Sequence, residues 1–334
     1  MKPTLRMGLV LLALLLLLSS CGSSPKKRTA TVFAMNTVMD LTVYGNADAL
    51  TAVESRIREL ERLFSVTDEN SELFAVNRDG GGTVSAETAA LISASLALCG
   101  RTGGALDITV YPVVRAWGFT TDAFRVPPEE ELAELLGVVD YRRVALDENR
   151  IALPSGGALD LGSVAKGYTA DCLTALLREA GVESALLNLG GNVQAIGTKP
   201  NGEGWRVAVR DPKGEGYVGV LTVSDRAVVT SGGYERYFER NGETYHHIID
   251  PATGHPAKSG LSSVTVVASQ GLLADALSTA LSVMGLDRAT EHWKQYRDFE
   301  AVFVAENGDL YLTEGLETVF SVQSSNAKVT VIHP

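Results

Sequence analysis

Apolar and polar residues alternate along some stretches of this chain and repeat with a helical period along others. Residues 29–45 alternate and are rich in valine and threonine, which predicts a pair of strands. Residues 47–65 have apolar side chains three or four positions apart with charged ones between, so they predict an amphipathic helix. Residues 85–104 predict a second helix, which begins at Ser85, and residues 130–137 predict a short third one.

The middle of the chain combines one long helix with a series of strands. Residues 142–162 predict a hairpin followed by a short strand. Residues 163–181 predict the longest helix after the N-terminal segment, with Ser163 as its N-cap and Gly181 as its end. From residue 184 to 268, short alternating segments are separated by turn residues, which is typical of strands.

A predicted helix over residues 273–285 is apolar on nearly all sides and still carries four polar residues. They lie three or four positions apart and so share one stripe of the helix: Asp275, Ser278, Thr279 and Ser282. A helix near 287–295 and two strands within 300–313 follow. Helices and strands therefore come in unequal runs, without strict alternation. This order predicts an α+β fold of mostly antiparallel sheets with packed helices, in two intimately joined lobes.

The first residues have the composition of a secretory signal peptide. Lys2 and Arg6 precede an apolar run that ends at Leu18, which is shorter than the ~20 residues that a membrane-spanning helix needs. The small residues that follow end in Cys21, and such a site resembles a bacterial lipobox, whose cysteine becomes lipidated with acyl chains such as palmitate. An ordinary signal peptide with a chance cysteine is the alternative.

This interpretation sets the expected domain organisation and location. Residues 1–20 are the predicted lipoprotein signal peptide, residues 21–30 a flexible tether, and residues 31–325 the folded domain. Removing the signal peptide takes the formal charge from -11 to -13, because two cations and no acid are lost. An acidic chain argues against nucleic acid as a partner. We expect a protein anchored by lipid to the extracytoplasmic face of the cell membrane.

Cysteine usage and short motifs exclude several common chemistries. Cys99 and Cys172 lie in helical patterns beside apolar neighbours, so they predict buried thiols, and two cysteines are too few for a disulfide framework. The sequence has no P-loop, no GxGxxG after a strand, and no HExxH, GxSxG or CxxC motif. The remaining candidates are therefore polar residues placed where an apolar pattern is expected.

Two of these candidates suggest an anion or metal site. Asp275 and Thr279 are four positions apart on one helix face, and a carboxylate with a hydroxyl offers the hard oxygen ligands that suit Mg²⁺ or Ca²⁺. A buried aspartate satisfied by local hydroxyls and backbone groups is the alternative. The segment 160–168 joins a strand to a helix, whose first amides and Lys166 would favour a phosphate. The alternative there is a capped helix with an exposed lysine.

A histidine pair adds a possible acid–base group. His246 and His247 are adjacent in a predicted strand, so only one of them can face a given site. A metal held by both is therefore improbable on geometric grounds. A single histidine that exchanges a proton or contacts a phosphate fits the pattern better.

Seven motifs occur together in an order that resembles one family. They are MNT (35–37), AWGF (116–119), DLGSVAKGY (160–168), NLGGN (188–192), SGGYERYF (231–238), YHHIIDPATGHP (245–256) and ADALSTALSVMG (274–285). In this order they are similar to the ApbE family, the FAD:protein FMN transferases. The resemblance extends from about residue 30 to 315. One departure is Asn36, where many members have glycine, and it affects the expected shape of a ligand-lining loop.

The resemblance implies roles for individual residues. Asp275 and Thr279 match the family's metal-binding pair, and Ser163 matches a third metal contact through its backbone oxygen. His247 matches a histidine near the reacting phosphates, and Asp275 is expected to take part in catalysis through the metal. The positions that match the lining of the FAD site are Met35, Trp117, Gly118, Phe119, Asp160 and Lys166, with Asp107 and Ile249 added.

The resemblance also implies an activity. It is the Mg²⁺-dependent transfer of FMN from FAD, through a phosphoester bond, to a threonine or serine of a target flavoprotein, with release of AMP. The implied acceptors are flavoprotein subunits of membrane electron-transport complexes, and Ca²⁺ is an alternative metal. Two alternative functions stay open: metal-dependent hydrolysis of FAD to FMN and AMP, and a non-catalytic lipoprotein that binds FAD.

Overall fold

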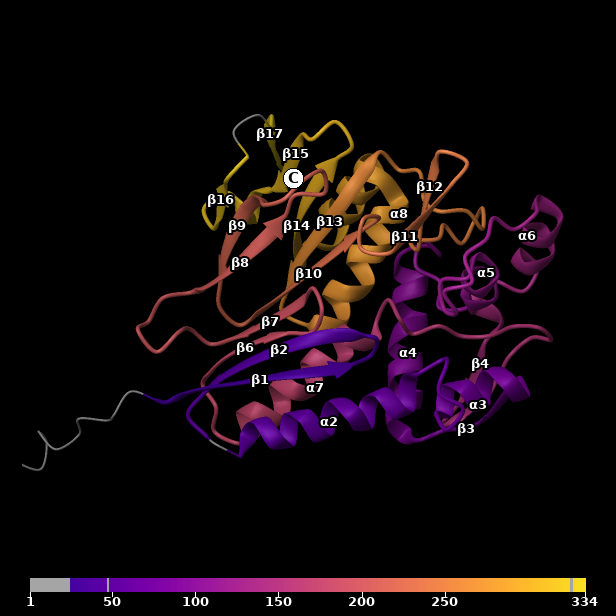
Figure 1. Ribbon diagram of the computed structural model, residues 1–334, viewed down its shortest axis with the longest axis horizontal. Helices are drawn as coiled ribbons and strands as arrows, with labels where there is room; N and C mark the ends of the chain where they lie inside the picture. The colour runs from indigo at the N-terminus through magenta and orange to yellow at the C-terminus, as the bar shows by residue number, and fades with distance from the viewer. Residues whose placement is uncertain (1–24, 47, 325–326) are drawn as a thin grey trace, which may run out of the picture.

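A nine-stranded sheet forms the centre of the computed structural model, which describes residues 25–46, 48–324 and 327–334 (Figure 1). Neighbouring strands are antiparallel except for the last pair, which is parallel. The spatial order is β1 (Lys27–Ala34), β2 (Thr37–Tyr44), β6 (Ser184–Asn188), β7 (Asn192–Ile196), β10 (Arg226–Gly232), β13 (Leu261–Ala268), β14 (Phe299–Ala305), β15 (Leu310–Thr313) and β17 (Val329–Ile332). The predicted α+β class with mostly antiparallel sheets is confirmed.

Three helices and a second sheet cover the two faces of the central sheet. The helices are α2 (Ala49–Phe64), α7 (Ala165–Glu179) and α8 (Gly271–Tyr296). Because side chains alternate along a strand, Val266 of β13 packs against α8 while its neighbour Val267 packs on the opposite face. That opposite face is covered by a three-stranded sheet of β8 (Trp205–Arg210), β9 (Tyr217–Val223) and β16 (Phe320–Val322).

A mainly helical part lies beside the sheet, to the right in Figure 1. Its longest helix, α4 (Ala86–Arg101), shares a core with α2 and α8, in which Leu91 and Ile92 are completely buried. This shared core joins the two parts without a linker. The other elements are α3 (Glu72–Asp79), β3 (Gly81–Thr83), α5 (Tyr111–Trp117), α6 (Glu129–Leu136), β4 (Ala145–Asp147), β5 (Arg150–Ala152), β11 (Tyr237–Arg240) and β12 (Glu243–His246), with 3-10 turns at Tyr141–Arg143 and Glu314–Leu316.

Several element boundaries differ from the sequence expectation. Ser163 is not the N-cap of α7, because the carbonyl of Leu161 accepts from the N–H groups of both Val164 and Ala165 and places Ser163 inside a turn before the helix. At 15 residues α7 is also shorter than α2 and α4, which have 16 each. The short helices α3 and α5 were not predicted.

The start of the first strand and the division of the last helix can be compared with the residues predicted for them. Strand β1 begins at Lys27, so part of the expected tether of residues 21–30 is strand. The predicted division between helices 273–285 and 287–295 corresponds to Gly285, whose backbone (φ 76°, ψ 170°) is non-helical within α8. The predicted signal peptide and Cys21 lie outside the described residues. Among the residues that the structure describes, no helix combines the length and apolarity needed to cross a bilayer.

Candidate active site

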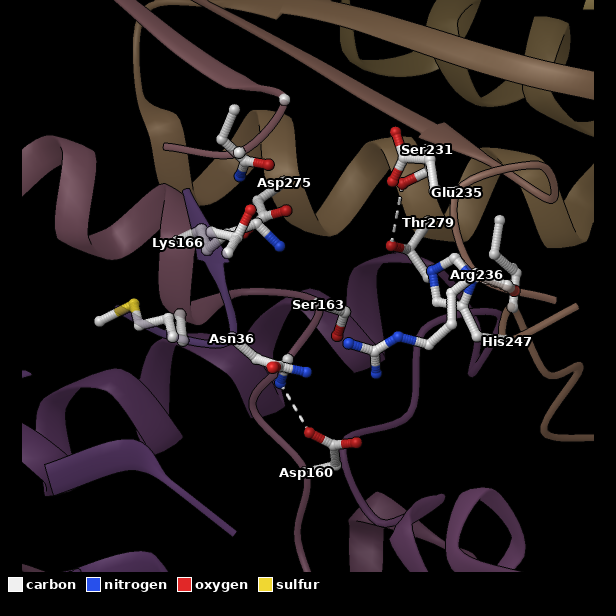
Figure 2. A pocket seen from close by; sticks show the side chains of 18 of the residues that line it. Asn36, Asp160, Ser163, Lys166, Ser231, Glu235, Arg236, His247, Asp275 and Thr279 are labelled. Carbon is white, nitrogen blue, oxygen red and sulfur yellow. Dashed lines mark hydrogen bonds between the residues drawn. The ribbon is translucent and has the colours of Figure 1, made fainter. Parts of the chain in front are cut away.

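A cavity of about 1070 Å³ opens at one end of the central sheet (Figure 2). Its wall is built from the β1–β2 turn, the β6–β7 turn, the start of α7, the segment between β10 and β11, and the first half of α8. Ligand pockets for small molecules usually measure roughly 300–1000 Å³, so this cavity is large enough for a dinucleotide.

The position of Asp275 depends on a close crossing of α7 and α8. Gly167 and Gly271 meet there, and a Cβ added to Gly167 would lie 2.2 Å from the Gly271 carbonyl oxygen. The Gly167 N–H donates to Oδ2 of Asp275 at 2.8 Å. One turn further along α7, the Asp171 carboxylate accepts from the N–H groups of Gly271 (2.6 Å) and Leu272 (2.9 Å). These contacts fix the start of α8 relative to the cavity.

The four polar residues of the α8 stripe form two pairs with different surroundings. Ser278 donates to the Asp275 carbonyl (2.9 Å) and Ser282 donates to the Ser278 carbonyl (2.8 Å). These buried hydroxyls therefore find their hydrogen-bond acceptors in the preceding turn of their own helix. Asp275 and Thr279 face the cavity instead. The hydroxyl of Ser231 on β10 lies 2.8 Å from that of Ser278 and 3.3 Å from that of Thr279. The shared stripe was therefore predicted correctly, but only two of its four members line the cavity.

The donor atoms at this point of the wall fit a hard divalent cation. Asp275 is only 4% exposed, and within the described part of the chain no group donates a hydrogen bond to its second oxygen, Oδ1. Oδ1 opens to the cavity, so it is free to bind a cation there. Thr279 and Ser163 add oxygen donors on the same cavity wall. The described residues form no cluster of three or more His, Cys, Asp or Glu side chains, so hydroxyl and backbone oxygens would have to complete the coordination of a cation here.

Cationic side chains line another part of the cavity. Lys166 lies in the first turn of α7, and no carboxylate of the described residues forms an ion pair with it. Arg236 donates to the Phe119 carbonyl at 3.1 Å. Asp160 accepts from the Gly162 N–H at 2.7 Å, and burial raises the pKa of its carboxyl group while Arg236 and Lys166 partly oppose that rise. Unpaired cations beside helix amides make this region suitable for an anionic phosphate.

His247 is the histidine that faces the cavity. Its Nδ1 lies 3.1 Å from the Arg236 carbonyl, so this nitrogen is the N–H donor and Nε2 carries a free lone pair. Burial, assisted by the charge of Arg236, lowers the pKa of His247 to about 3, so the ring is neutral near pH 7. The ring of His246 bonds to the Ala257 carbonyl instead and does not line the cavity. The prediction that only one of the pair faces the site is confirmed.

Ten of the residues singled out in the sequence lie on the cavity wall: Met35, Asp107, Phe119, Asp160, Ser163, Lys166, His247, Ile249, Asp275 and Thr279. Asn36 lies there too. Met35 (φ 49°) and Asn36 (φ 57°) both adopt left-handed backbone, as a two-residue hairpin turn requires, and this explains why glycine is an alternative at position 36. The Asp107 carboxylate accepts hydrogen bonds from Thr109 and from the Tyr141 N–H, and so it holds two loops together.

Trp117 and Gly118 do not line the cavity, contrary to the expectation. Trp117 is completely buried, and its Nε1 donates to the Gly254 carbonyl at 2.8 Å. Gly118 ends α5 with φ 87°, and a Cβ there would lie 2.3 Å from the Ala123 carbonyl oxygen. Both residues therefore support the loop that carries Phe119.

Glu235 is a wall residue that sequence reasoning missed. Desolvation by the surrounding protein, with Asp275 adding to it, raises the pKa of Glu235 to about 7, although Lys166, Arg210 and Arg236 act in the opposite direction. The side chain remains open to the cavity. Its position beside Arg236 in SGGYERYF was the only available signal, and a charged residue in a loop does not by itself indicate a site.

The sequence matches a known protein family over most of its length. The model of the ApbE family matches residues 35–303. The chain belongs to the ApbE family. A relative from Treponema pallidum (strain Nichols), named FAD:protein FMN transferase, is 34% identical over 88% of this chain and 90% of its own length. A protein of the same name from Klebsiella pneumoniae (strain 342) is 33% identical over 86% of this chain and 92% of its own.

Solved structures of ApbE proteins share the fold. The ApbE protein of Thermotoga maritima is 33% identical and superposes with a TM-score of 0.83, covering 88% of this chain and 99% of that one. The flavinyl transferase ApbE of Pseudomonas stutzeri in its apo form is 27% identical, with a TM-score of 0.81 over 91% of this chain and 99% of that one. The ApbE-like fold expected from the motifs is therefore confirmed.

Proposed function

We propose that this protein transfers FMN from FAD to a threonine or serine hydroxyl of an acceptor protein and releases AMP. The main support is one cavity, large enough for a dinucleotide, whose wall brings several groups together. They are the unpaired Asp275 oxygen, the cations Lys166 and Arg236, and the neutral His247. The relatives named FAD:protein FMN transferases support the same reaction. In this transfer, the acceptor Oγ forms a bond to the phosphorus of the FMN half of FAD. The bond between this phosphorus and the oxygen that bridges the two phosphates breaks, and AMP leaves with the bridging oxygen.

Each wall residue has a definable part in this reaction. Asp275, Thr279 and the backbone oxygen of Ser163 would hold Mg²⁺, which when bound neutralises charge on the pyrophosphate. Lys166 and Arg236 bind phosphate oxygens and orient the phosphorus for attack. Nε2 of His247 is free to accept the hydroxyl proton of the acceptor. A loose transition state asks little of a base, so the low pKa of His247 is compatible with this role.

The proposal includes a place and a class of acceptor. We propose that Cys21 anchors the protein by lipid to the extracytoplasmic face of the cell membrane, where flavoprotein subunits of membrane electron-transport complexes would be its acceptors. The sequence features that support this are the apolar run to Leu18 and the small-residue site that ends in Cys21.

Replacing Cys21 with alanine is expected to move the protein from the membrane fraction to the soluble or secreted fraction. The reason is that lipid chains on Cys21 are the proposed anchor, at about 0.8 kcal/mol per buried CH₂ group. Fractionation with immunoblotting of both forms measures the effect. A Cys21→Ala protein that stays fully membrane-bound contradicts the anchor.

Replacing Glu235 with glutamine is expected to remove a pH dependence of FAD binding near pH 7. The pKa of Glu235 in the folded protein is raised to about 7, so the carboxyl group loses its charge as the pH falls through that value. Metal-free FAD, with its anionic pyrophosphate, should then bind the wild type more tightly at about pH 6 than at about pH 8. The variant should bind equally at both, and flavin fluorescence titration in chelator measures this. An unchanged pH dependence in the variant assigns the titration to another group.

A direct assay distinguishes transfer from its alternatives. The full-length protein is incubated with FAD, Mg²⁺ and a purified flavoprotein domain from a membrane electron-transport complex, and the products are separated by chromatography and mass spectrometry. Transfer predicts AMP together with a heavier acceptor. FMN and AMP formed without an acceptor, and an acceptor of unchanged mass, would instead identify a FAD hydrolase. FAD recovered intact would identify a binding protein.

A further inference from the structure

Strand β1 forms one edge of the central sheet and pairs with β2 alone. The two strands join through a two-residue turn, closed by the pair Ala34↔Thr37, and the residues that flank such a turn exchange both backbone hydrogen bonds. Even-numbered residues of β1 therefore bond to β2. The same alternation holds at the start of β1, where the carbonyl of the even-numbered Lys26 accepts from the Gly45 N–H at 3.1 Å.

The odd-numbered residues of β1 consequently direct their backbone groups away from the sheet. These are Thr29, Thr31 and Phe33, and no described residue forms a hydrogen bond with their N–H or C=O groups. Edge strands are commonly protected by proline, charged residues or a bulge. The charged residues of β1, Lys27 and Arg28, lie at its start, far from the turn, while residues 29–34 contain no proline or charge and pair with β2 without a bulge. Among the residues that the structure describes, none covers residues 29–34 on this side, so this part of the edge can accept another strand.

The open edge leads directly into the cavity. Phe33 belongs to the cavity wall and is still 65% exposed, and its cross-strand partner Val38 is 53% exposed. The next two residues, Met35 and Asn36, line the cavity beyond them. An extended chain paired with β1 would thus run alongside the exposed Phe33 and end near the cavity wall formed by Met35 and Asn36.

We propose that an extended segment of the acceptor protein adds to β1 as a tenth strand of the central sheet and so carries its threonine or serine into the cavity. Backbone hydrogen bonds at Thr29, Thr31 and Phe33 hold the segment. Phe33, the exposed residue of β1 nearest the cavity, contacts an apolar side chain of it. This inference rests on the proposed FMN transfer, since that reaction requires a hydroxyl from another protein to reach the FAD phosphate.

Thr31→Pro tests the strand addition. It removes one outward N–H and puts a ring in the path of the incoming strand, and β1 tolerates it because that N–H is not used within the sheet. We expect the KM for the acceptor domain to rise at least about tenfold, with unchanged affinity for FAD, because Thr31 does not line the cavity. Thr31→Val is the matched control: it keeps the N–H, loses only the hydroxyl that donates to Asp40, and should label the acceptor like the wild type.

Hydrogen exchange of the wild type gives a second measurement that does not depend on how a variant folds. Adding the acceptor domain is expected to slow exchange of about three amides within residues 27–34. A Thr31→Pro protein that labels the acceptor with unchanged KM, or amides that exchange equally with and without it, would overturn the strand addition. Amides already protected without acceptor would indicate a second copy of this chain on the edge and would also overturn it. A wild type that labels no acceptor refutes the proposed transfer itself.

Discussion

The Asp275→Asn variant is expected to lose FMN transfer by about a thousandfold while keeping its fold. Asparagine can still accept the Gly167 N–H through its amide oxygen, so the crossing of α7 and α8 keeps its hydrogen bond. What disappears is the negative charge beside the unpaired Oδ1, and with it the ability to hold a divalent cation at the pyrophosphate. Losing electrostatic stabilisation of this kind typically costs roughly 10²–10³ in rate.

The measurement for Asp275→Asn has three parts: AMP release, the heat of Mg²⁺ binding, and the midpoint of thermal unfolding. Activity and metal binding should fall together, with little change in the midpoint. Asp287→Asn is the matched control, because it makes the same change on an exposed position of the same helix, away from the cavity. Undiminished Mg²⁺ binding in Asp275→Asn would contradict the assignment of this carboxylate to the metal.

The Gly167→Ala variant is expected to be destabilised strongly, by about 3 kcal/mol or more. Its Cβ would lie 2.2 Å from the Gly271 carbonyl oxygen and 2.6 Å from Cβ of Asp275. The first of these is backbone and cannot rotate away, so α7 and α8 must separate, and overpacking of this kind costs typically 1–3 kcal/mol and occasionally more. The same separation would pull Asp275 from the cavity wall, so activity should fall with stability.

Denaturant unfolding of Gly167→Ala and Gly100→Ala measures this effect against a control. Gly100 is also a helical glycine, in α4, but its Cβ would meet nothing closer than 3.9 Å. Alanine there should be neutral or stabilise by up to about 1 kcal/mol, because alanine is the better helix former. Similar stabilities for the two variants would show that the glycine crossing does not position α8.

Local pattern was enough to predict the parts of the site that one element carries. Asp275 and Thr279 share a helix face because they are four residues apart, and of the adjacent His246 and His247 only the second lines the cavity. The α+β class followed from the unequal runs of helix and strand. Each of these depends on residues that are close in the sequence.

Features that depend on distant segments could not be predicted in this way. The contact of Gly167 with Gly271 joins residues that are 104 positions apart, and no periodicity encodes it. The motif AWGF suggested that Trp117 faces a ligand, but its indole is held by the Gly254 carbonyl from another loop. The raised pKa of Glu235 likewise arises from desolvation and from the charge of Asp275, a residue that lies 40 positions away in the sequence.

Mass spectrometry of an acceptor domain, incubated with the full-length protein, FAD and Mg²⁺, tests the central claim most directly. The account predicts that the acceptor gains the mass of FMN less one water on a threonine or serine, with one AMP released for each acceptor labelled, and that Asp275→Asn gives neither product. An acceptor of unchanged mass beside free FMN and AMP, or full labelling by Asp275→Asn, would contradict it.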